Sequence, residues 1–433
     1  MQFWFDIISL MFNTMIFSFL TPFFWLVIFI VFMQYRRTVA MEKKLFGRSI
    51  NSVGIQTLYS VLFGIMGGLF GSFFLLLLGI SLDNIGIIYL WPVAILLFML
   101  NPRFLCFAYA GGILAMASLF LQAIQTVYPA LGEVPVLAGL LKIHLPGLLA
   151  LVGILHLTEA FLILISGHRG ASPIFLKAPS GKIVGGFSMQ RFWPLPLMGL
   201  WALVVAETSE MFVGGVAMPE WWPLLGTVMS VGGGEKVVYL MVPLVAGLGY
   251  SELALSSHPR EKRVKTAFQL ALYSLVLSLV AVASVYYPLM IIAATLIAPL
   301  GHEFLIKMGN KAEFSGPPLF HAGADGPQIM ALIPGAAAER SGLQAGDRLL
   351  ELNGFRLRNE MDFWQILSFH YGRVIVKFSR GDRLLTLPLQ FNSRNLQEGS
   401  GIIFSPGPEA AVYVELKSSS LRDKLRRRFR KNR

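Results

Sequence analysis

The sequence predicts a polytopic α-helical membrane domain followed by a small α/β domain. Composition predicts the membrane part, because 55% of the 433 residues are hydrophobic and only 14% are charged. A soluble domain cannot keep so much apolar surface away from water, so a bilayer must cover it. Near residue 311, long apolar runs are replaced by alternating patterns and turn residues. We therefore expect the membrane domain over residues 1–310.

Apolar runs long enough to span a membrane recur before residue 311. A spanning helix needs about 20 largely apolar residues. We expect eight or nine such helices, because the stretch 267–306 contains a break at Tyr287-Pro288 that allows one or two. The expected helices cover residues 16–33, 56–80, 85–100, 104–125, 145–165, 194–214, 237–256, 267–285 and 287–306.

The loops between these runs differ in charge. Loops 34–52, 166–193 and 257–266 are rich in Lys and Arg, and the turn at Arg103 is also basic, whereas the alternate loops are acidic or neutral. Basic loops favour the cytoplasmic side of a membrane. If successive loops alternate between the two sides of the membrane, all basic loops and the C-terminal domain lie in the cytoplasm. This holds whether or not the run at 16–33 spans the membrane.

The most specific signal in the chain lies shortly after residue 327. A strand at 328–333 precedes a Pro-Gly turn, a short Ala-rich helix, a second strand at 348–353 and a tight turn. This order resembles the central part of bacterial PDZ domains, with matching residues Pro334, Gly335, Gly342, Gly346, Asp347, Asn353 and Gly354. The glycines allow backbone conformations closed to other residues, and Asp347 can fix its turn by hydrogen bonding to local backbone. We expect a PDZ-like domain over residues 312–395.

PDZ domains bind an extended peptide as an added strand beside a helix, and backbone amides hold the peptide carboxylate. The resemblance implies that the carboxylate cradle precedes the strand at 328, at Leu319, Phe320, His321, Ala322 and Gly323. The groove helix would be 360–370, with candidate groove residues Phe363, Ile366 and Leu367. Three alternatives stay open: the helix residues are simply core, the domain binds an internal segment, or it packs on its own membrane part and binds nothing.

Six ionisable residues fall within the apolar runs: His156, Glu159, Glu207, Glu210, His302 and Glu303. Ionisable groups at membrane depth are costly, so each marks a candidate functional site. The segment 301–306 resembles the HExxH motif of site-2-type intramembrane metalloproteases, where two His bind zinc and the Glu activates water. Ile306 occupies the second His position, so the motif is broken.

We therefore expect no catalytic residue, no bound metal and no cofactor, and interpret these groups as polar contacts between helices or as positions near the membrane interface. A nonstandard ion site stays open, although nothing in the sequence connects His156 with the broken motif. A transporter pathway through Glu159 and Glu207 is a further alternative. The one cysteine, Cys106, excludes a disulfide framework and any metal site of several cysteines.

A basic extension, 396–433, ends the chain. Leu421, Leu425 and Phe429 recur at helical spacing among basic residues Arg422, Lys424, Arg426, Arg427, Arg428, Arg430, Lys431 and Arg433. A basic amphipathic helix suits the anionic inner leaflet, so we expect contact with anionic lipids; a disordered tail is the alternative. We expect no nucleic acid as a partner.

The layout, together with the loop segment 165–197, resembles MinJ-type proteins, cell-division topology factors of Gram-positive-like bacteria. The loop contains Ala171-Ser-Pro173, Gly185-Gly-Phe187 and Gln190-Arg-Phe-Trp-Pro194. The resemblance implies a non-enzymatic scaffold at the bacterial plasma membrane, enriched at septa and poles. Its PDZ-like domain would recruit cytoplasmic or membrane-associated proteins, and the implied partners are MinD and DivIVA. An intramembrane metalloprotease-like protein with a broken motif, or a transporter, is the alternative.

Overall fold

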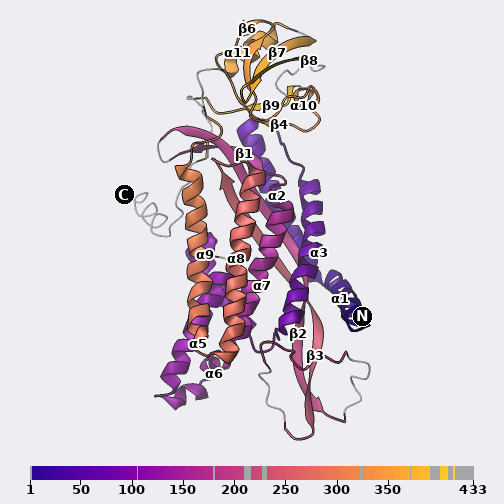
Figure 1. The fold of residues 1–433 in the computed structure, drawn as a ribbon, viewed down its shortest axis with the longest axis vertical. Coiled ribbons are helices and arrows are strands. Elements are labelled where there is room, and N and C mark those ends of the chain that lie inside the picture. Colours follow the sequence, from indigo (N-terminus) through magenta and orange to yellow (C-terminus); the bar gives the residue numbers. More distant parts are fainter. Residues whose placement is uncertain are drawn as a thin grey trace, which may run out of the picture.

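The computed structural model describes residues 2–104, 106–178, 181–208, 216–226, 232–321, 326–370, 372–390, 400–407 and 413–414. Figure 1 shows an elongated bundle of helices around a long β-hairpin, with a small β-rich domain at one end.

The bundle is mostly helical. Its helices are α1 (Gln2–Leu20), α2 (Pro22–Phe46), α3 (Val53–Leu78), α4 (Ile87–Leu100), α5 (Phe107–Gln125), α6 (Pro135–Leu141), α7 (Leu145–Ser166), α8 (Pro259–Tyr286) and α9 (Met290–Ser315), with short 3-10 helices η1 (Pro102–Phe104) and η2 (Pro129–Glu133). Among the described residues, six helices are long and apolar enough to span a membrane: α2, α3, α5, α7, α8 and α9. The apolar part of α1 and the whole of α4 are shorter, so the expected number of eight or nine is not confirmed.

The single helix expected at 16–33 is divided between α1 and α2. The chain leaves α1 at Leu20, and Thr21 adopts an extended conformation before Pro22 begins α2. Proline suits the first position of a helix, where its missing N–H is not needed.

Two expected helices, 194–214 and 237–256, are wrong, because the described parts of these segments are mainly β-strands. The strands are β1 (Ser172–Lys177), β2 (Ile183–Ala206) and β3 (Glu235–Ala254), in an antiparallel sheet of order β1-β2-β3. β2 and β3 pair continuously from Phe187 opposite Ala254 to Ala206 opposite Glu235. Length and hydrophobicity predicted helices, but an apolar run does not by itself distinguish a buried strand from a helix.

Beyond its pairing with β1, the edge of β2 that faces away from β3 lies against helices, which supply partners for its backbone. The Phe192 N–H donates to the Tyr35 hydroxyl at 3.3 Å, and the Met198 N–H donates to Ser72 Oγ at 2.8 Å. In lipid, backbone polar groups must find partners within the protein. Side chains of α2 and α3 therefore make a strand tolerable at membrane depth.

Between these two hydrogen bonds, β2 meets α3 at prolines and glycines. A Cβ on Gly64 would lie 2.1 Å from the Pro194 carbonyl oxygen, and a Cβ on Gly68 would lie 2.1 Å from the Pro196 carbonyl oxygen. Proline has no N–H that needs a partner, and glycine lets two backbones approach closely. The Pro194-Leu-Pro196 run was a sequence signal against a regular helix, since proline inside a helix removes a hydrogen bond and clashes with the preceding turn.

The expected small α/β domain follows α9. Its elements are β4 (Ile329–Leu332), α10 (Ala337–Arg340), β5 (Arg348–Leu352), β6 (Phe355–Arg356), α11 (Glu360–Ser368), β7 (Arg373–Arg380), β8 (Arg383–Gln390) and β9 (Ile402–Phe404). They form a four-stranded sheet, β6-β5-β7-β8, and a two-stranded sheet, β4-β9. The core between them includes Leu349, Phe363, Val376 and Phe404, all nearly inaccessible to solvent.

A buried carboxylate organises the end of the bundle that carries this domain. Glu42 in α2 accepts hydrogen bonds from the N–H groups of Ile50 (2.8 Å) and Asn51 (3.0 Å) and from Ser172 Oγ (2.5 Å). Its side chain is inaccessible to solvent. Glu42 therefore joins the loop after α2 to the start of β1.

A second buried carboxylate fixes the end of α9. Glu313 accepts hydrogen bonds from the N–H groups of Leu255 and Ser256, each at 2.9 Å. Lys262 Nζ lies 3.6 Å from the same carboxylate. The chain thus enters the α/β domain from a helix end that is tied to β3 and α8.

Candidate functional site

The motif that predicted a PDZ-like domain forms the turns around α10 and β5. Pro334 and Gly335 lie in the turn before α10, and Gly342 and Gly346 lie in turns after it. Asn353 and Gly354 connect β5 to β6 with positive φ angles of 49° and 82°. Consecutive positive φ angles at Asn-Gly are typical of a tight hairpin turn, as the sequence predicted.

Asp347 extends the motif to the four-stranded sheet. Its carboxylate is 1% exposed and accepts hydrogen bonds from Arg380 Nε and Nη2, each at 2.7 Å. The Gln344 N–H donates to the same carboxylate at 2.8 Å. Hydrogen bonding to Asp347 raises the pKa of the Arg380 guanidinium. Asp347 therefore fixes its own turn, as expected, and also ties that turn to β7 by a bidentate pair.

Helix α11 packs beside the short strand β9. The Phe404 ring lies 5.1 Å from the Phe363 ring and 5.8 Å from Trp364, between centroids. Phe363 and Leu367 are inaccessible to solvent, whereas Ile366 is only partly buried. Of the three candidate groove residues on this helix, Ile366 is therefore the one with solvent-accessible surface that a ligand could contact.

The segment expected to form the carboxylate cradle lies elsewhere. The strand beside β4 is β9, which comes from beyond residue 395, and not the segment 319–323. Phe320 forms an isolated bridge with Gly185 of β2, and its side chain is buried. Leu319 and exposed His321 flank that bridge, and Ala322 and Gly323 fall outside the described residues. Sequence order placed the cradle wrongly, because the neighbour of β4 comes from the far end of the domain.

One edge of β9 faces the membrane domain. β9 pairs with β4 on one side, where the Ile333 N–H donates to the Gly401 carbonyl at 2.8 Å. The next carbonyl, that of Ile402, accepts a hydrogen bond from Arg48 Nη2 at 3.4 Å. Arg48 belongs to the loop between α2 and α3, so the membrane domain reaches the edge where an extended peptide would add.

An apolar surface holds the PDZ-like domain on the bundle. Met330 of β4 and Ile403 of β9 pack in one cluster with Phe46, Phe175 and Phe320. In Figure 1, β4 and β9 lie next to the bundle, whereas β6 and α11 lie at the far side of the domain. The domain therefore presents one face to the membrane domain and the opposite face away from it.

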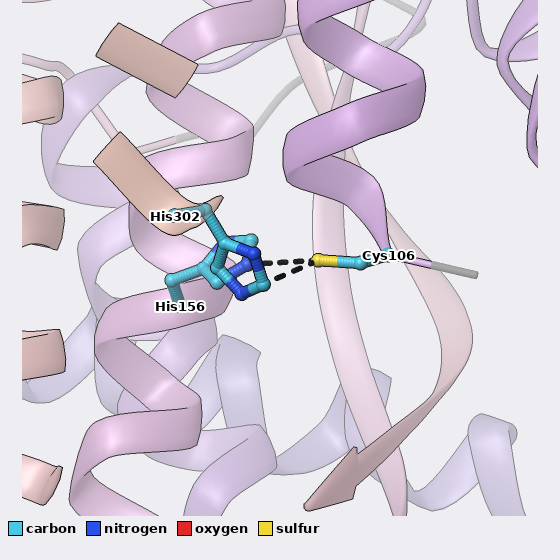
Figure 2. A group of neighbouring side chains, drawn as sticks. All are labelled: Cys106, His156 and His302. Carbon is cyan, nitrogen blue, oxygen red and sulfur yellow. Dashed lines mark hydrogen bonds between the residues drawn. The ribbon is translucent and has the colours of Figure 1, made fainter. Parts of the chain in front are cut away.

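Two of the six ionisable residues meet in the bundle, and they meet the single cysteine. Cys106 Sγ lies 3.2 Å from His156 Nε2 and 3.7 Å from His302 Nε2 (Figure 2). These residues come from the N-terminus of α5, the middle of α7 and the middle of α9. Sequence reasoning named both histidines but missed Cys106, since nothing in the chain order brings residue 106 to them.

Glu303, the acidic residue of the broken motif, is held by other groups. Its carboxylate forms an ion pair with Arg103 and accepts a hydrogen bond from the Tyr109 hydroxyl at 2.6 Å. Lys307 Nζ lies 3.5 Å from it, one turn along α9. These contacts are the polar contacts between helices that the sequence analysis expected, and they engage the carboxylate that a protease mechanism would need as a base.

The other acidic candidates do not gather with these residues. Glu159 is partly buried in α7, one turn after His156. Glu207 is exposed, directly after the end of β2, and its N–H donates to the Gly234 carbonyl at 2.8 Å. Glu210 lies outside the described residues.

Comparison with known proteins identifies a relative over most of the chain. The sequence is 27% identical over 392 residues to the cell division topological determinant MinJ of Bacillus subtilis (strain 168), covering 89% of this chain and 92% of that protein. The resemblance to MinJ-type proteins is thereby confirmed. No protein-family model matches the sequence. Among solved structures, the PDZ domain of an SdrC-like protein from Listeria monocytogenes matches with 20% identity and a TM-score of 0.17, over 18% of this chain and 87% of that chain.

Proposed function

We propose that this chain, which resembles MinJ-type proteins along most of its length, is a membrane scaffold that helps to place cell division. The observation that carries the proposal is the match over 89% of the chain to a division topological determinant. The match takes in both the membrane domain and most of the region after it. Its role would be recruitment of proteins rather than catalysis.

The way the PDZ-like domain is mounted supports a scaffold. One face is held by the cluster around Met330, while the opposite side carries exposed apolar residues. Phe355, Met361, Phe369 and Ile375 are each more than half exposed, and three of them lie in or next to β6 and α11. Exposed apolar residues gathered on one side of a domain suit contact with a protein partner. A domain held on the bundle by one face would keep such a partner close to the membrane domain.

An extended peptide is the expected ligand. It would add to the edge of β9, with α11 and Ile366 beside it, in the manner of PDZ recognition. The Arg48 hydrogen bond at Ile402 would have to give way, so binding would compete with docking of the membrane domain. The partners implied by the resemblance, MinD and DivIVA, are proposed as the proteins recruited.

The distribution of basic residues bears on where the chain lies in the cell. Basic residues at the PDZ-like end, among them Arg48, Lys262 and Arg263, favour a cytoplasmic position for that end. We propose the bacterial plasma membrane, with enrichment at septa and poles. The basic tail at 422–433 lies outside the described residues, and its contact with anionic lipids stays a prediction.

Photo-crosslinking in the native bacterium tests the proposal directly. A photoreactive amino acid replaces Phe369, 76% exposed on the PDZ-like domain, or Trp25, 59% exposed on α2, in the full-length chain carrying a fluorescent tag. We expect septal fluorescence, and division-protein adducts from position 369 but not from position 25. Uniform membrane fluorescence, together with normal division in a strain that lacks the chain, would contradict the proposed function.

A further inference from the structure

We propose that Cys106, His156 and His302 form a binding site for a zinc ion inside the membrane domain. The chain contains one cysteine and seven histidines, and the cysteine meets two of the histidines at one point. One candidate ligand atom from each residue lies within 4.8 Å of the other two. Figure 2 shows the two imidazole rings turned toward the sulfur from separate helices.

The distances suit a tetrahedral zinc ion. With a Zn–S bond of about 2.3 Å and Zn–N bonds of about 2.0–2.1 Å, tetrahedral geometry separates sulfur and nitrogen by about 3.5 Å. The Cys106 to His156 and Cys106 to His302 distances, 3.2 and 3.7 Å, lie on either side of that value. The two sulfur-to-nitrogen distances therefore need only small shifts to suit one ion.

The hydrogen bonding of His156 prepares it as a ligand. Its Nδ1 lies 2.7 Å from the Val152 carbonyl oxygen, which can only accept, so Nδ1 carries the proton. The lone pair then sits on Nε2, the atom that faces Cys106 Sγ. A backbone carbonyl that orients a histidine in this way is typical of metal-ligating histidines.

His302 and Cys106 each add a second observation. His302 Nδ1 is buried and has no hydrogen-bond partner among the described residues, although an unpaired buried nitrogen is costly. Cys106 occupies the N-cap of α5, where its Sγ accepts from the Ala108 N–H at 3.4 Å. The thiolate is the form of cysteine that binds a metal ion.

The ligand set favours zinc over other ions. Thiolate and imidazole together suit zinc, whereas magnesium and calcium prefer oxygen ligands. The group within the described chain has three members, which leaves the fourth position to water, as in zinc sites that keep an open position. Zinc with one thiolate keeps a single positive charge.

Zinc content of the full-length chain tests the site. The wild-type protein and its Cys106→Ser, His156→Asn and His302→Asn variants are purified in detergent, and zinc is measured by elemental mass spectrometry. We expect about one zinc per wild-type chain and background levels in the three variants. The matched control is His258→Asn, which changes an exposed histidine at the start of α8 and should keep its zinc.

A second measurement needs no variant, in case a substitution prevents folding. Wild-type protein is stripped with a chelator and reloaded with cobalt(II), whose bond to thiolate gives an ultraviolet charge-transfer absorption. Cys106, the only cysteine in the chain, should also react with a maleimide slowly before chelation and rapidly after it. Absence of the cobalt–thiolate band, or zinc that all three variants retain, overturns the proposal. Neither outcome bears on the division scaffold, which the crosslinking experiment tests separately.

Discussion

The Gly185 N–H donates a hydrogen bond to the Phe320 carbonyl at 2.8 Å, and this contact joins the long hairpin of the membrane domain to the segment that enters the PDZ-like domain. The Phe187 and Phe320 rings pack edge to face beside it, 5.8 Å apart. The hairpin is therefore more than a membrane anchor, since one end of it forms part of the seat of the PDZ-like domain.

Replacement of Gly185 by Val should release the PDZ-like domain from its seat. A Cβ at Gly185 would lie 2.5 Å from Met330 Sδ and 3.0 Å from Phe320 Cβ, so a branched side chain does not fit. We expect Phe320, 1% exposed, to become accessible to chymotrypsin, with a C-terminal fragment that appears faster than in wild type. Gly407→Val is the control, because a Cβ there meets nothing within 4 Å. Equal cleavage of wild type and Gly185→Val would show that this contact does not hold the domain.

Replacement of Arg48 by Gln should strengthen peptide binding to the PDZ-like domain. The substitution weakens the competing hydrogen bond at the Ile402 carbonyl. One such bond contributes about 0.5–1.5 kcal/mol, which corresponds to an affinity gain of about 2- to 10-fold. The measurement is fluorescence anisotropy with a peptide selected by phage display on the full-length protein in nanodiscs. Arg36→Gln, an exposed arginine of α2, should leave the affinity unchanged. Weaker binding by the Arg48 variant would count against competition at this edge.

Replacement of Gly68 by Ala should destabilise the membrane domain. The new Cβ would lie 2.1 Å from the Pro196 carbonyl oxygen, a backbone atom that cannot move aside as a flexible side chain can. Overpacking of this kind costs about 1–3 kcal/mol. Thermal unfolding in detergent, followed by intrinsic fluorescence, should show a lower midpoint. Gly54→Ala in the same helix is the control, since its Cβ meets nothing within 4 Å, and an equal loss in both variants would refute the explanation.

Replacement of Glu42 by Ala should loosen the end of the bundle on which the PDZ-like domain sits. The change removes the acceptor for the Ile50 and Asn51 N–H groups in a buried place. Each unsatisfied buried donor costs about 1–3 kcal/mol. Hydrogen exchange should therefore quicken in the loop after α2 and in β1. The control is Asp382→Ala, in the exposed turn between β7 and β8, which should leave exchange in the loop after α2 and in β1 unchanged. If Glu42→Ala also left exchange in these segments unchanged, the carboxylate would not stabilise this end of the bundle.

The sequence predicts turns and hydrogen bonds between neighbouring residues, but it misses contacts between segments that are distant in the chain. The turn chemistry at Asn353 and the carboxylate at Asp347 act on their neighbours, so their roles are visible in order along the chain. The segment 194–206 was misread because hydrophobicity says how deeply a segment is buried and not which hydrogen bonds it makes. The proline pair inside it was the signal against a regular helix.

In the candidate sites, too, the sequence predicts local features and misses contacts between distant parts of the chain. α11 was placed from helical spacing, but its neighbouring strand, Ile402–Phe404, is separated from β4 by most of the domain. The likeness to PDZ domains in chain order therefore pointed to the wrong segment for the cradle. His156 and His302 were recognised as candidates because ionisable groups are costly at membrane depth. An isolated cysteine in an apolar run is not unusual, so the sequence does not indicate a role for it. Only the packing of α5 against α7 and α9 connects Cys106 with them.

Because β9 comes late in the chain, the PDZ-like domain can complete its fold only near the end of synthesis. β4, α10, β5 and α11 all leave the ribosome before residues 402–404 do, so an unfinished chain has a helix but no strand beside it. Helices α1 to α9 and the hairpin of β2 and β3 precede them all and can enter the bilayer first. A copy that is still being translated, or one that a protease has shortened before residue 402, is then unable to present the edge of β9 to anything. The proposed recruitment through this edge therefore depends on residues 402–404, which follow β4, α10, β5 and α11 in the chain.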